Sequence, residues 1–320
     1  MTDALSLLFL GAGKRLSLFE RVAGACRREG VRPRLHSYED TATVPVASAA
    51  TVTVGLRWDD PAFGEHVLEV VRRHRIGVVI PCMDGATVAL ARVAPALAEE
   101  GCWAVVSDID LCRVFDDKRL MERWFLDHGV TTPIWRPDAP LPWIVKHIHG
   151  FGSRRQFVVR THAEFERMTA DIDLGDYVVQ PLLDGPEFTI DAYVSRAGEV
   201  LGCVTRRRLQ VVDGEVVQSV TERQPSLVAE TTRILGLGGF RGPVTFQAIR
   251  HADRFWFVEG NLRFGGGVIL SMEAGADYAR LLVREALGRP VAPVVWREGV
   301  LMTRAYREVF HEGYVYGHHG

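Results

Sequence analysis

The first third of the chain alternates between short apolar runs and amphipathic segments. Residues 5–10 form an apolar run that stops at a Gly-Ala-Gly turn, and apolar positions then recur at helical spacing as far as Gly30. The same alternation predicts strands near 33–38, 51–54, 78–81 and 102–107, and helices at 63–75 and 86–100. Short strands that alternate with amphipathic helices indicate βαβ units and a parallel sheet.

The pattern changes from about residue 116. Asp116-Asp117 is placed to cap a helix that contains Met121, Trp124 and Phe125, and a proline-rich stretch follows at 133–142. A small unit then runs to about residue 184, with a strand ending at Lys146, strands at 156–160 and 176–182, and a helix at 162–170.

The remaining sequence has the period-two alternation of an antiparallel sheet. It predicts strands at 187–195, 199–208 and 215–221, a helix at 226–236, a hairpin across 243–258, a helix at 274–287 and a last strand around 300–309. We therefore expect an α/β and α+β fold with three parts: a Rossmann-like domain at 1–114, a small central unit at 115–184 and an antiparallel-sheet unit at 185–320.

Charge and composition narrow the function classes. Lys and Arg total 38 against 40 Asp and Glu, so no strong positive field exists to hold nucleic acid or an anionic membrane. Only three of the cationic residues are lysines, Lys14, Lys118 and Lys146, whereas 35 are arginines. Because arginine is the usual cation in this chain, we expect each lysine to have a specific role. The five cysteines lack metal-site spacing, and no apolar run approaches 18 residues, so we expect a cytoplasmic protein.

The glycine turn at 11–13 resembles nucleotide motifs without completing one. Leu8 occupies the position of the first P-loop glycine, and Leu16 occupies that of the third dinucleotide-fingerprint glycine. Glu39 or Asp40 could serve as the acidic partner in such a fingerprint. A plain strand-to-helix turn is the simpler interpretation, and a phosphate or carboxylate at this helix N-terminus stays open.

Candidate chemistry is concentrated at the end of the apolar strand 255–258. Glu259, Asn261 and Arg263 are spaced i, i+2, i+4, so in extended conformation they share one face. If the turn at 252–254 is a three-residue loop, Gln247 lies opposite Glu259 on that face. Carboxylate and amide oxygens suit Mg²⁺, and an adjacent arginine suits phosphate. A solvated hairpin face is the alternative interpretation.

Two earlier segments have features of a nucleotide site. Lys146 precedes a glycine-containing loop at 150–153, where backbone N–H groups can approach a polyphosphate. The apolar strand that ends at Gln180-Pro181 leaves its sheet at the proline and exposes backbone groups to a purine edge. Glu187 follows a Gly-Pro turn and could accept hydrogen bonds from ribose hydroxyls. Glu187 taken alone reads more simply as a solvated turn carboxylate.

With these residues in view, the chain resembles the ATP-grasp superfamily, and within it the carbamoyl-phosphate-synthase-like branch of carboxylate ligases. The resemblance covers nearly the whole chain. Its most specific parts are Asp117-Lys118 at a helix start, the segment Glu187-Phe188-Thr189-Ile190-Asp191, and the run from Val258 to Gly267 that contains Glu259, Asn261 and Arg263.

The resemblance implies a central lid domain at 115–184 and a role for each candidate residue. Lys118 and Lys146 would hold the ATP phosphates beneath a loop with Gly150, Gly152 and Ser153; Gln180, Leu182 and Leu183 would border adenine; Glu187 would bind ribose; Gln247, Glu259 and Asn261 would ligate Mg²⁺ or Mn²⁺; and Arg263 would meet the transferred phosphate and the acyl group, with Arg206 and Arg208 as anion-holding arginines. Gln180 departs from the family's usual glutamate, His147 from its usual proline, and Arg154-Arg155-Gln156 from its small loop residues.

The resemblance also implies a reaction. A small carboxylate, such as an amino acid, would be activated as an acyl phosphate with release of ADP and then attacked by an amine or similar nucleophile. Substrate pockets are expected between residues 11–15 with Asp84-Gly85 and residues 206–208 with 265–267. Small molecules are the expected partners, and a homodimer is left open. A non-catalytic, regulatory ATP-binding protein is the main alternative, and an NAD(P)-dependent oxidoreductase is disfavoured by Leu16.

Overall fold

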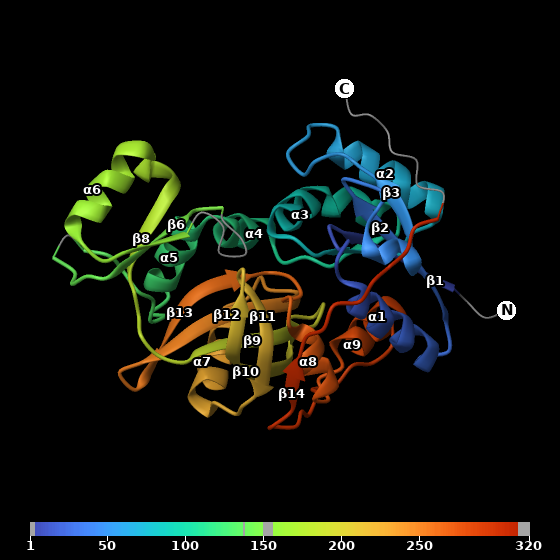
Figure 1. Cartoon of the computed structure of the whole chain (residues 1–320). Coiled ribbons are helices and arrows are strands. Elements are labelled where there is room, and N and C mark those ends of the chain that lie inside the picture. Colours follow the sequence, from blue (N-terminus) through green and yellow to red (C-terminus); the bar gives the residue numbers. More distant parts are fainter. Residues whose placement is uncertain (1–3, 137, 150–155, 313–320) are drawn as a thin grey trace.

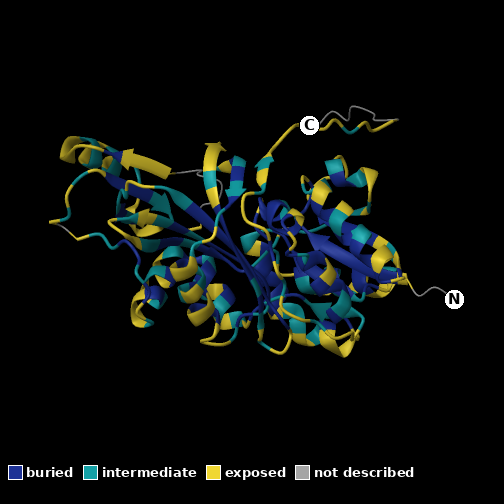
Figure 2. Ribbon diagram, turned by 90° about the horizontal axis from the view of Figure 1, so that it is seen from below, coloured by how far each residue is buried: buried dark blue, intermediate teal, exposed yellow. Residues whose placement is uncertain are grey.

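The computed structural model describes residues 4–136, 138–149 and 156–312, and its strands form three sheets (Figure 1). Strands through the middle of the molecule are buried, whereas exposed residues gather on the outer helices and loops (Figure 2). None of the helices in the described ranges is long and apolar enough to cross a membrane. The mixed architecture of parallel and antiparallel sheets agrees with the predicted fold class.

The first sheet is parallel, as predicted, with strand order β3-β2-β1-β4-β5. Its strands are β1 (Ala4–Leu10), β2 (Arg32–Glu39), β3 (Thr51–Val54), β4 (Val78–Pro81) and β5 (Trp103–Ala104), and its helices are α1 (Leu16–Arg28), α2 (Phe63–His74) and α3 (Asp84–Glu99). Leu7 and Phe9 pack toward α1, while Leu8 and Leu10 pack toward α2 and α3. Both faces of β1 are covered, which explains its continuous apolar run.

The second sheet is small and antiparallel, with order β7-β6-β8. It contains β6 (Trp143–His147), β7 (Gln156–Val159) and β8 (Tyr177–Pro181), with α6 (His162–Asp171) beside it at one end of the molecule (Figure 1). Its own core is Trp143, Val145 and Val159, with Trp135 and Phe165 packed against them. The small sheet therefore has a hydrophobic cluster separate from the larger cores.

The third sheet has six strands in the order β13-β12-β9-β10-β11-β14. They are β9 (Glu187–Val194), β10 (Val200–Val212), β11 (Glu215–Thr221), β12 (Gly242–His251), β13 (Arg254–Asn261) and β14 (Leu301–Thr303). Along β9, Phe188 and Ile190 enter a hydrophobic core, whereas Glu187, Thr189 and Asp191 lie on the opposite face because side chains alternate along a strand. The sheet therefore has an apolar face and a partly polar face.

Three helices cover the apolar face of this sheet: α4 (Ile109–Asp116), α5 (Lys118–Asp127) and α7 (Pro225–Leu235). The α4 helix was not predicted. Phe125 of α5 packs against Phe246 and Phe257, although the sequence assigns α5 to the central unit. Asp117 caps α5, because its carboxylate accepts hydrogen bonds from the backbone N–H groups of Arg119 and Leu120. The boundaries at 114 and 184 stay predictions.

Two predicted elements near the C-terminus are wrong in extent. The helix expected at 274–287 is α9 (Tyr278–Ala286), which begins four residues later, and the α8 helix (Val268–Glu273) before it was not predicted. Gly275 separates the two helices with a φ of +119°, and a Cβ there would lie 2.8 Å from the Val295 carbonyl oxygen. The strand expected around 300–309 is only β14, after which Arg307 reaches Glu20 of α1 at 2.5 Å.

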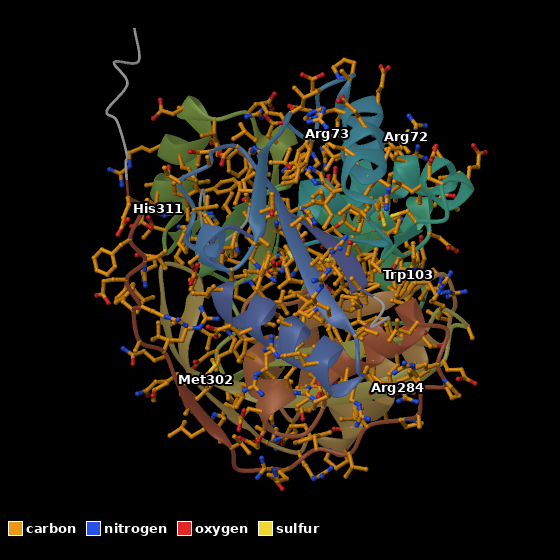
Figure 3. All side chains as sticks on the ribbon, turned by 90° about the vertical axis from the view of Figure 1, so that its right-hand side faces the viewer. Arg72, Arg73, Trp103, Arg284, Met302 and His311 are labelled. Atoms are coloured by element: carbon orange, nitrogen blue, oxygen red, sulfur yellow. The ribbon has the colours of Figure 1, made fainter. Side chains whose placement is uncertain are left out.

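The α1 helix is joined to α9 through one buried carboxylate, Glu29, whose side chain is 4% exposed. Arg280, Arg284 and Arg289 donate hydrogen bonds to it at 2.6 to 2.9 Å. Arg284 lies on α9, on the side of the molecule where α1 and α9 are seen together (Figure 3). The hydrogen bond from Arg280 is the main reason that the pKa of Glu29 falls to about 2.

Glu29→Gln is expected to lower the free energy of unfolding at pH 7 by about 1.5–3 kcal/mol, the range for hydrogen bonds to charged groups. A carboxylate with a depressed pKa stabilises the fold above its unfolded value near 4.5 and loses that contribution as the pH falls toward 2. Urea unfolding of both proteins at pH 7 and pH 3 should show the gap narrowing. A gap of constant size would contradict this role.

Candidate active site

The polar face of the six-stranded sheet carries its side chains in two rows. In the first row, Gln247 of β12 lies opposite Glu259 of β13 on one side and opposite Thr189 of β9 on the other. Thr189 in turn lies opposite Arg206 of β10. The second row contains Asn261, Thr245 and Asp191. Residues that are adjacent across strands have neighbouring side chains, so the four strands build one continuous site.

The pairing of Gln247 with Glu259 is confirmed, but the three-residue loop proposed to cause it is wrong. The turn has two residues, Ala252 and Asp253, both with positive φ, and His251 pairs with Arg254. A two-residue loop alone would place Gln247 opposite Val258. A β-bulge beyond the Ala248 pair inserts one residue into β13 and restores the predicted partner.

The predicted metal ligands supply oxygen atoms from two adjacent strands. Asn261 donates its amide N–H to Glu259 Oε1 at 3.2 Å, and its Oδ1 accepts from Arg263 Nη2 at 3.3 Å. The set has one carboxylate and two amides, and within the described ranges no group of three or more His, Cys, Asp or Glu residues could hold a metal. Such a set fits a hard cation that takes its other ligands from water and substrate phosphates, as Mg²⁺ does.

Arg263 links this face to the N-terminal sheet. Its Nε and Nη2 atoms each lie 2.8 Å from an Asp84 oxygen, at the start of α3. The pair is bidentate, a geometry that fixes the plane of the guanidinium group. The structure therefore brings Asp84 and Arg263 together at the junction where the sequence predicted substrate pockets.

Lys146 approaches the same face from the small sheet. Its Nζ donates to Gln180 Oε1 at 3.0 Å. Burial lowers the pKa of Lys146, Glu259 raises it, and Lys118 lowers it again, so the three charged groups are neighbours. Lys118 begins α5, and its Nζ lies 3.5 Å from the Ile148 carbonyl oxygen. The two predicted phosphate lysines thus converge, while Gly150, Gly152 and Ser153 lie outside the described residues.

Glu122 of α5 belongs to this cluster and was missed from the sequence, where it is one charged residue on an amphipathic helix. Burial raises the pKa of Glu122 to about 7. A hydrogen bond with Gln180 and the charge of Lys146 act in the opposite direction and lower it. The Glu122 carboxylate is therefore a hydrogen-bond partner of Gln180, and position 180 is the one at which the resemblance predicts a glutamate.

The free energy of unfolding of the wild-type protein is expected to fall as the pH rises from about 4.5 to about 7, and in Glu122→Gln this fall should be smaller. In that interval the unfolded Glu122 is ionised while the folded one stays protonated, so folding stability falls with rising pH. Urea midpoints at pH 5 and pH 8 measure the effect. Glu166→Gln, at an exposed position on α6, is the control and should leave the wild-type difference intact.

The two predicted anion-binding arginines of β10 are both ion-paired. Arg206 is 1% exposed, and its Nε donates to Asp191 Oδ2 at 2.8 Å. Its Nη1 is buried and has no hydrogen-bond partner. Arg208 Nε lies 3.1 Å from Glu187 Oε1, so the predicted ribose ligand contacts an arginine in this structure. The orphaned Nη1 of Arg206 and the orphaned Oγ1 of Thr189 both lie in the first row, where a bound ligand or water could satisfy them.

The end of β8 holds the predicted adenine-binding residues. Gln180 is buried with its side chain on Lys146, and Pro181 pairs with Trp143. The Leu182 N–H donates to the Pro142 carbonyl oxygen at 2.9 Å, so that donor is used within the protein. Leu183 follows at intermediate exposure. Their role toward a nucleotide stays a prediction.

Known proteins share this fold. A family model described as "ATP-grasp in the biosynthetic pathway with Ter operon" matches residues 173–307. The N5-carboxyaminoimidazole synthetase of Staphylococcus aureus, complexed with ADP, is similar over 92% of this chain and 81% of that one, with a TM-score of 0.74 and 11% identity. The chain therefore has the ATP-grasp fold, and its residues 173–307 match a family model of that type.

Two further solved structures have the same ATP-grasp architecture. The biotin carboxylase domain of the Hydrogenobacter thermophilus 2-oxoglutarate carboxylase, with MgADP, ADP and bicarbonate, has a TM-score of 0.71 and 16% identity over 92% of this chain and 72% of that one. The L-amino acid ligase of Bacillus licheniformis has a TM-score of 0.68 and 18% identity over 91% and 76%. No curated protein sequence matches the chain significantly. The carbamoyl-phosphate-synthase-like branch stays a prediction.

The glycine turn after β1 is occupied by a carboxylate of the protein itself. Ala12 N donates to Glu39 Oε1 at 2.8 Å, and the Ser37 hydroxyl also donates to that oxygen. Burial raises the pKa of Glu39 while these hydrogen bonds lower it. Glu39 therefore fills the position that a phosphate would need, which argues against the dinucleotide interpretation. Lys14 is exposed beside it.

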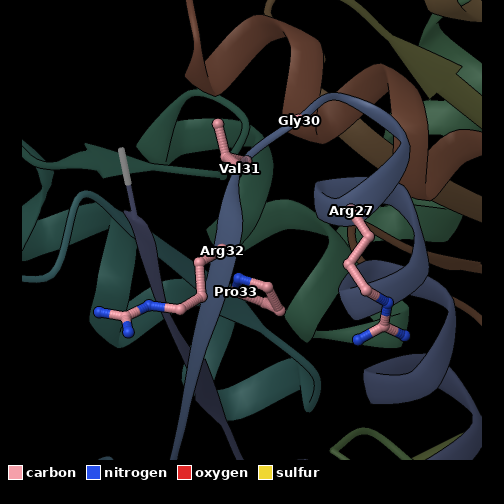
Figure 4. A pocket seen from close by; sticks show the side chains of 5 residues that line it. All are labelled: Arg27, Gly30, Val31, Arg32 and Pro33. Atoms are coloured by element: carbon pink, nitrogen blue, oxygen red, sulfur yellow. The ribbon is translucent and has the colours of Figure 1, made fainter. Parts of the chain in front are cut away.

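A hollow at the α1–β2 junction lies among residues that no prediction singled out. It is lined by Arg27, Gly30, Val31, Arg32 and Pro33 (Figure 4). These side chains include no carboxylate and no nucleophile. The hollow therefore does not compete with the polar sheet face as the candidate active site.

Proposed function

We propose that this protein is an ADP-forming ligase that activates a small carboxylate, such as an amino acid, as an acyl phosphate for attack by an amine. The observation that carries the proposal is the meeting of oxygen ligands and cations on one sheet face. Glu259 and Asn261 lie beside Arg263, and Glu259 is close enough to Lys146 to raise its pKa. This arrangement suits phosphoryl transfer, in which positioning and charge stabilisation supply most of the catalysis.

The proposed reaction has two steps. A carboxylate oxygen of the acid forms a bond to the γ-phosphorus of ATP while the bond from that phosphorus to ADP breaks. The amine nitrogen then forms a bond to the acyl carbon, inorganic phosphate leaves with the electron pair of the acyl–oxygen bond, and the amine loses a proton to water. Magnesium, held by Gln247, Glu259 and Asn261, would neutralise charge on the phosphate oxygens.

The side chains have distinct tasks in this proposal. Lys118 and Lys146 hold the phosphate groups, and no protein nucleophile is needed. Arg263, fixed by Asp84, is placed at the junction of two sheets, where the activated acid would lie. A bidentate carboxylate partner reduces the orientational freedom of this arginine before the substrate binds. The buried set therefore acts by prepositioned charge.

The similar structures support a nucleotide-dependent ligase without identifying its substrate. The carboxylase domain was crystallised as a dimer with MgADP and bicarbonate, and another similar protein is named an L-amino acid ligase. The main alternative, a regulatory ATP-binding protein, needs fewer groups than this chain retains. A homodimer stays a proposal that sedimentation can test.

Release of ADP from Mg²⁺-ATP, measured across a panel of small acids with hydroxylamine as the amine, tests the proposal. An acid that is a substrate should stimulate ADP release and yield its hydroxamate in equal amount, because hydroxylamine traps acyl phosphates. ATP binding without stimulation by any acid would favour the regulatory alternative. No binding of ATP at saturating concentration would overturn the assignment to nucleotide chemistry.

A further inference from the structure

Arginines from separate elements converge on the backbone of residues 264–267. Arg15, the residue before α1, donates from Nη1 to the Phe264 carbonyl oxygen at 2.6 Å. Arg263 donates from its own Nη1 to the same oxygen at 3.2 Å. One carbonyl thus holds two guanidinium groups, one from the N-terminal unit and one from the end of the hairpin. Repulsion between two cations this close is a cost that an anion between or beside them would relieve.

Two more guanidinium groups contact the next residues of this segment. Arg304, which follows β14, donates from Nη2 to the Gly266 carbonyl oxygen. The unpartnered Nη1 of buried Arg206 faces Gly267, where an added Cβ would lie only 2.6 Å from it. An orphaned N–H on a buried arginine is rare in a folded protein and is usually satisfied by a ligand or water.

The charges of this arginine cluster, Arg15, Arg206, Arg263 and Arg304, do not balance. Three of its members have a carboxylate partner: Asp84 for Arg263, Asp191 for Arg206 and Glu215 for Arg304. Among the residues that the structure describes, Arg15 forms no ion pair, and its hydrogen-bond partner is a carbonyl oxygen. Burial lowers the pKa of Arg15, and the charges of Arg263 and Arg304 lower it further, whereas Cys82 and the Asp84 carboxylate, which is already ion-paired with Arg263, raise it. The cluster therefore carries one excess positive charge in a partly buried place.

We propose that the arginine cluster binds a second anionic group of the substrate, so that the acid activated by this protein is a dianion. The inference rests on the proposed function, in which Arg263 and the metal ligands receive the reacting carboxylate. Arg15 supplies the uncompensated charge for the other group, and Arg304 lies close enough to share it. The second group is a carboxylate or a phosphate, because both match the planar donor fork of arginine.

The deciding variant is Arg15→Met, with Arg27→Met as the matched control. Arg27 lies near the other end of α1, is exposed, and loses the same guanidinium charge. Circular dichroism and a melting curve establish that each variant is folded, and Arg15→Lys serves as a second variant that retains the charge but lacks the fork. Two readouts are used: melting temperature with MgADP plus succinate, inorganic phosphate or acetate, and ADP release with alanine, aspartate, glutamate and phosphoserine.

We expect succinate or phosphate to raise the melting temperature more than acetate does, and acids with two anionic groups to be the better substrates. Arg15→Met should raise the half-saturating concentration of the dianion roughly 10- to 100-fold, as loss of a charged hydrogen bond implies, with little change for ATP. Preference for aspartate or glutamate identifies a carboxylate as the second group, and preference for phosphoserine identifies a phosphate.

Two results would overturn the inference and leave the proposed ligase intact: efficient use of an acid with a single anionic group, or an unchanged dianion requirement in Arg15→Met. Failure of every acid to stimulate ADP release would count against the ligase itself. In that event the melting curves still test the cluster, because stabilisation by the dianion that Arg15→Met abolishes and Arg27→Met retains supports it. Absence of any dianion effect in both readouts rejects it.

Discussion

Replacing Glu259 with glutamine is expected to lower the turnover of Mg²⁺-ATP roughly 10²- to 10³-fold, the usual effect of removing one group that stabilises charge in a transition state. Glu259 is the one carboxylate of the proposed metal set, and the amide keeps its shape while losing its charge. Loss of the Glu259 charge also leaves the positive charge of Lys146 less well neutralised, because Glu259 is the strongest influence that raises the pKa of this lysine. Steady-state ADP release at several Mg²⁺ concentrations measures both effects.

Asp253→Asn is the control for Glu259→Gln. It removes one negative charge from the same hairpin, at a side chain that is 99% exposed in the turn. The control should retain wild-type turnover and wild-type Mg²⁺ dependence. Equal turnover of Glu259→Gln and the wild-type protein would show that this face does not hold the catalytic metal.

Asp191→Asn is expected to lower the free energy of unfolding by about 3–5 kcal/mol, because it leaves the buried charge of Arg206 uncompensated. Both residues are 1% exposed, and Asp191 also accepts a hydrogen bond from the Ser271 hydroxyl at 2.6 Å. For a chain of this length the melting temperature should fall by roughly 5–8 °C. Calorimetry and urea unfolding measure the change.

A double variant separates a buried charge from a general loss of packing. Asp191→Leu combined with Arg206→Met removes both charges and fills the space with apolar groups, so it should recover most of the stability that Asp191→Asn loses. The activity of the double variant should stay low, because Arg206 is a proposed anion ligand. An Asp191→Asn protein that melts within about 1 °C of the wild type would contradict the importance of this pair.

Residues that act within one strand could be predicted from the sequence. Side chains alternate along a strand, so the spacing of Glu259 and Asn261 is enough to place them on one face, whereas Arg263 lies two residues beyond the end of β13. Turn geometry is less secure, because a two-residue loop and a bulge together produced the pairing of Gln247 that a three-residue loop would also produce. The two-residue loop with a bulge and the three-residue loop without one produce the same pattern of polar and apolar residues, so the sequence cannot distinguish the two arrangements.

Residues that act across elements could not be predicted in the same way. Asp84 binds Arg263 although 179 positions separate them, and Glu122 reaches Gln180 from a helix that packs against another sheet. Arg15 contacts Phe264 across 249 positions. No local period connects such positions, and one arginine among 35 carries no signal of its own.

By itself the sequence determined most of the order of strands and helices, the polar and apolar faces of the strands, and the residue types able to bind phosphate and a hard cation; the α4 and α8 helices were not predicted. These properties follow from hydrophobic periodicity and from side-chain chemistry, both of which are local. The tertiary structure decided which charges neutralise one another: Glu39 closes the glycine turn, Asp191 pairs with Arg206, and Arg15 forms no ion pair of its own among the described residues. Charge balance depends on distances between elements far apart in the chain, and only folding sets those distances.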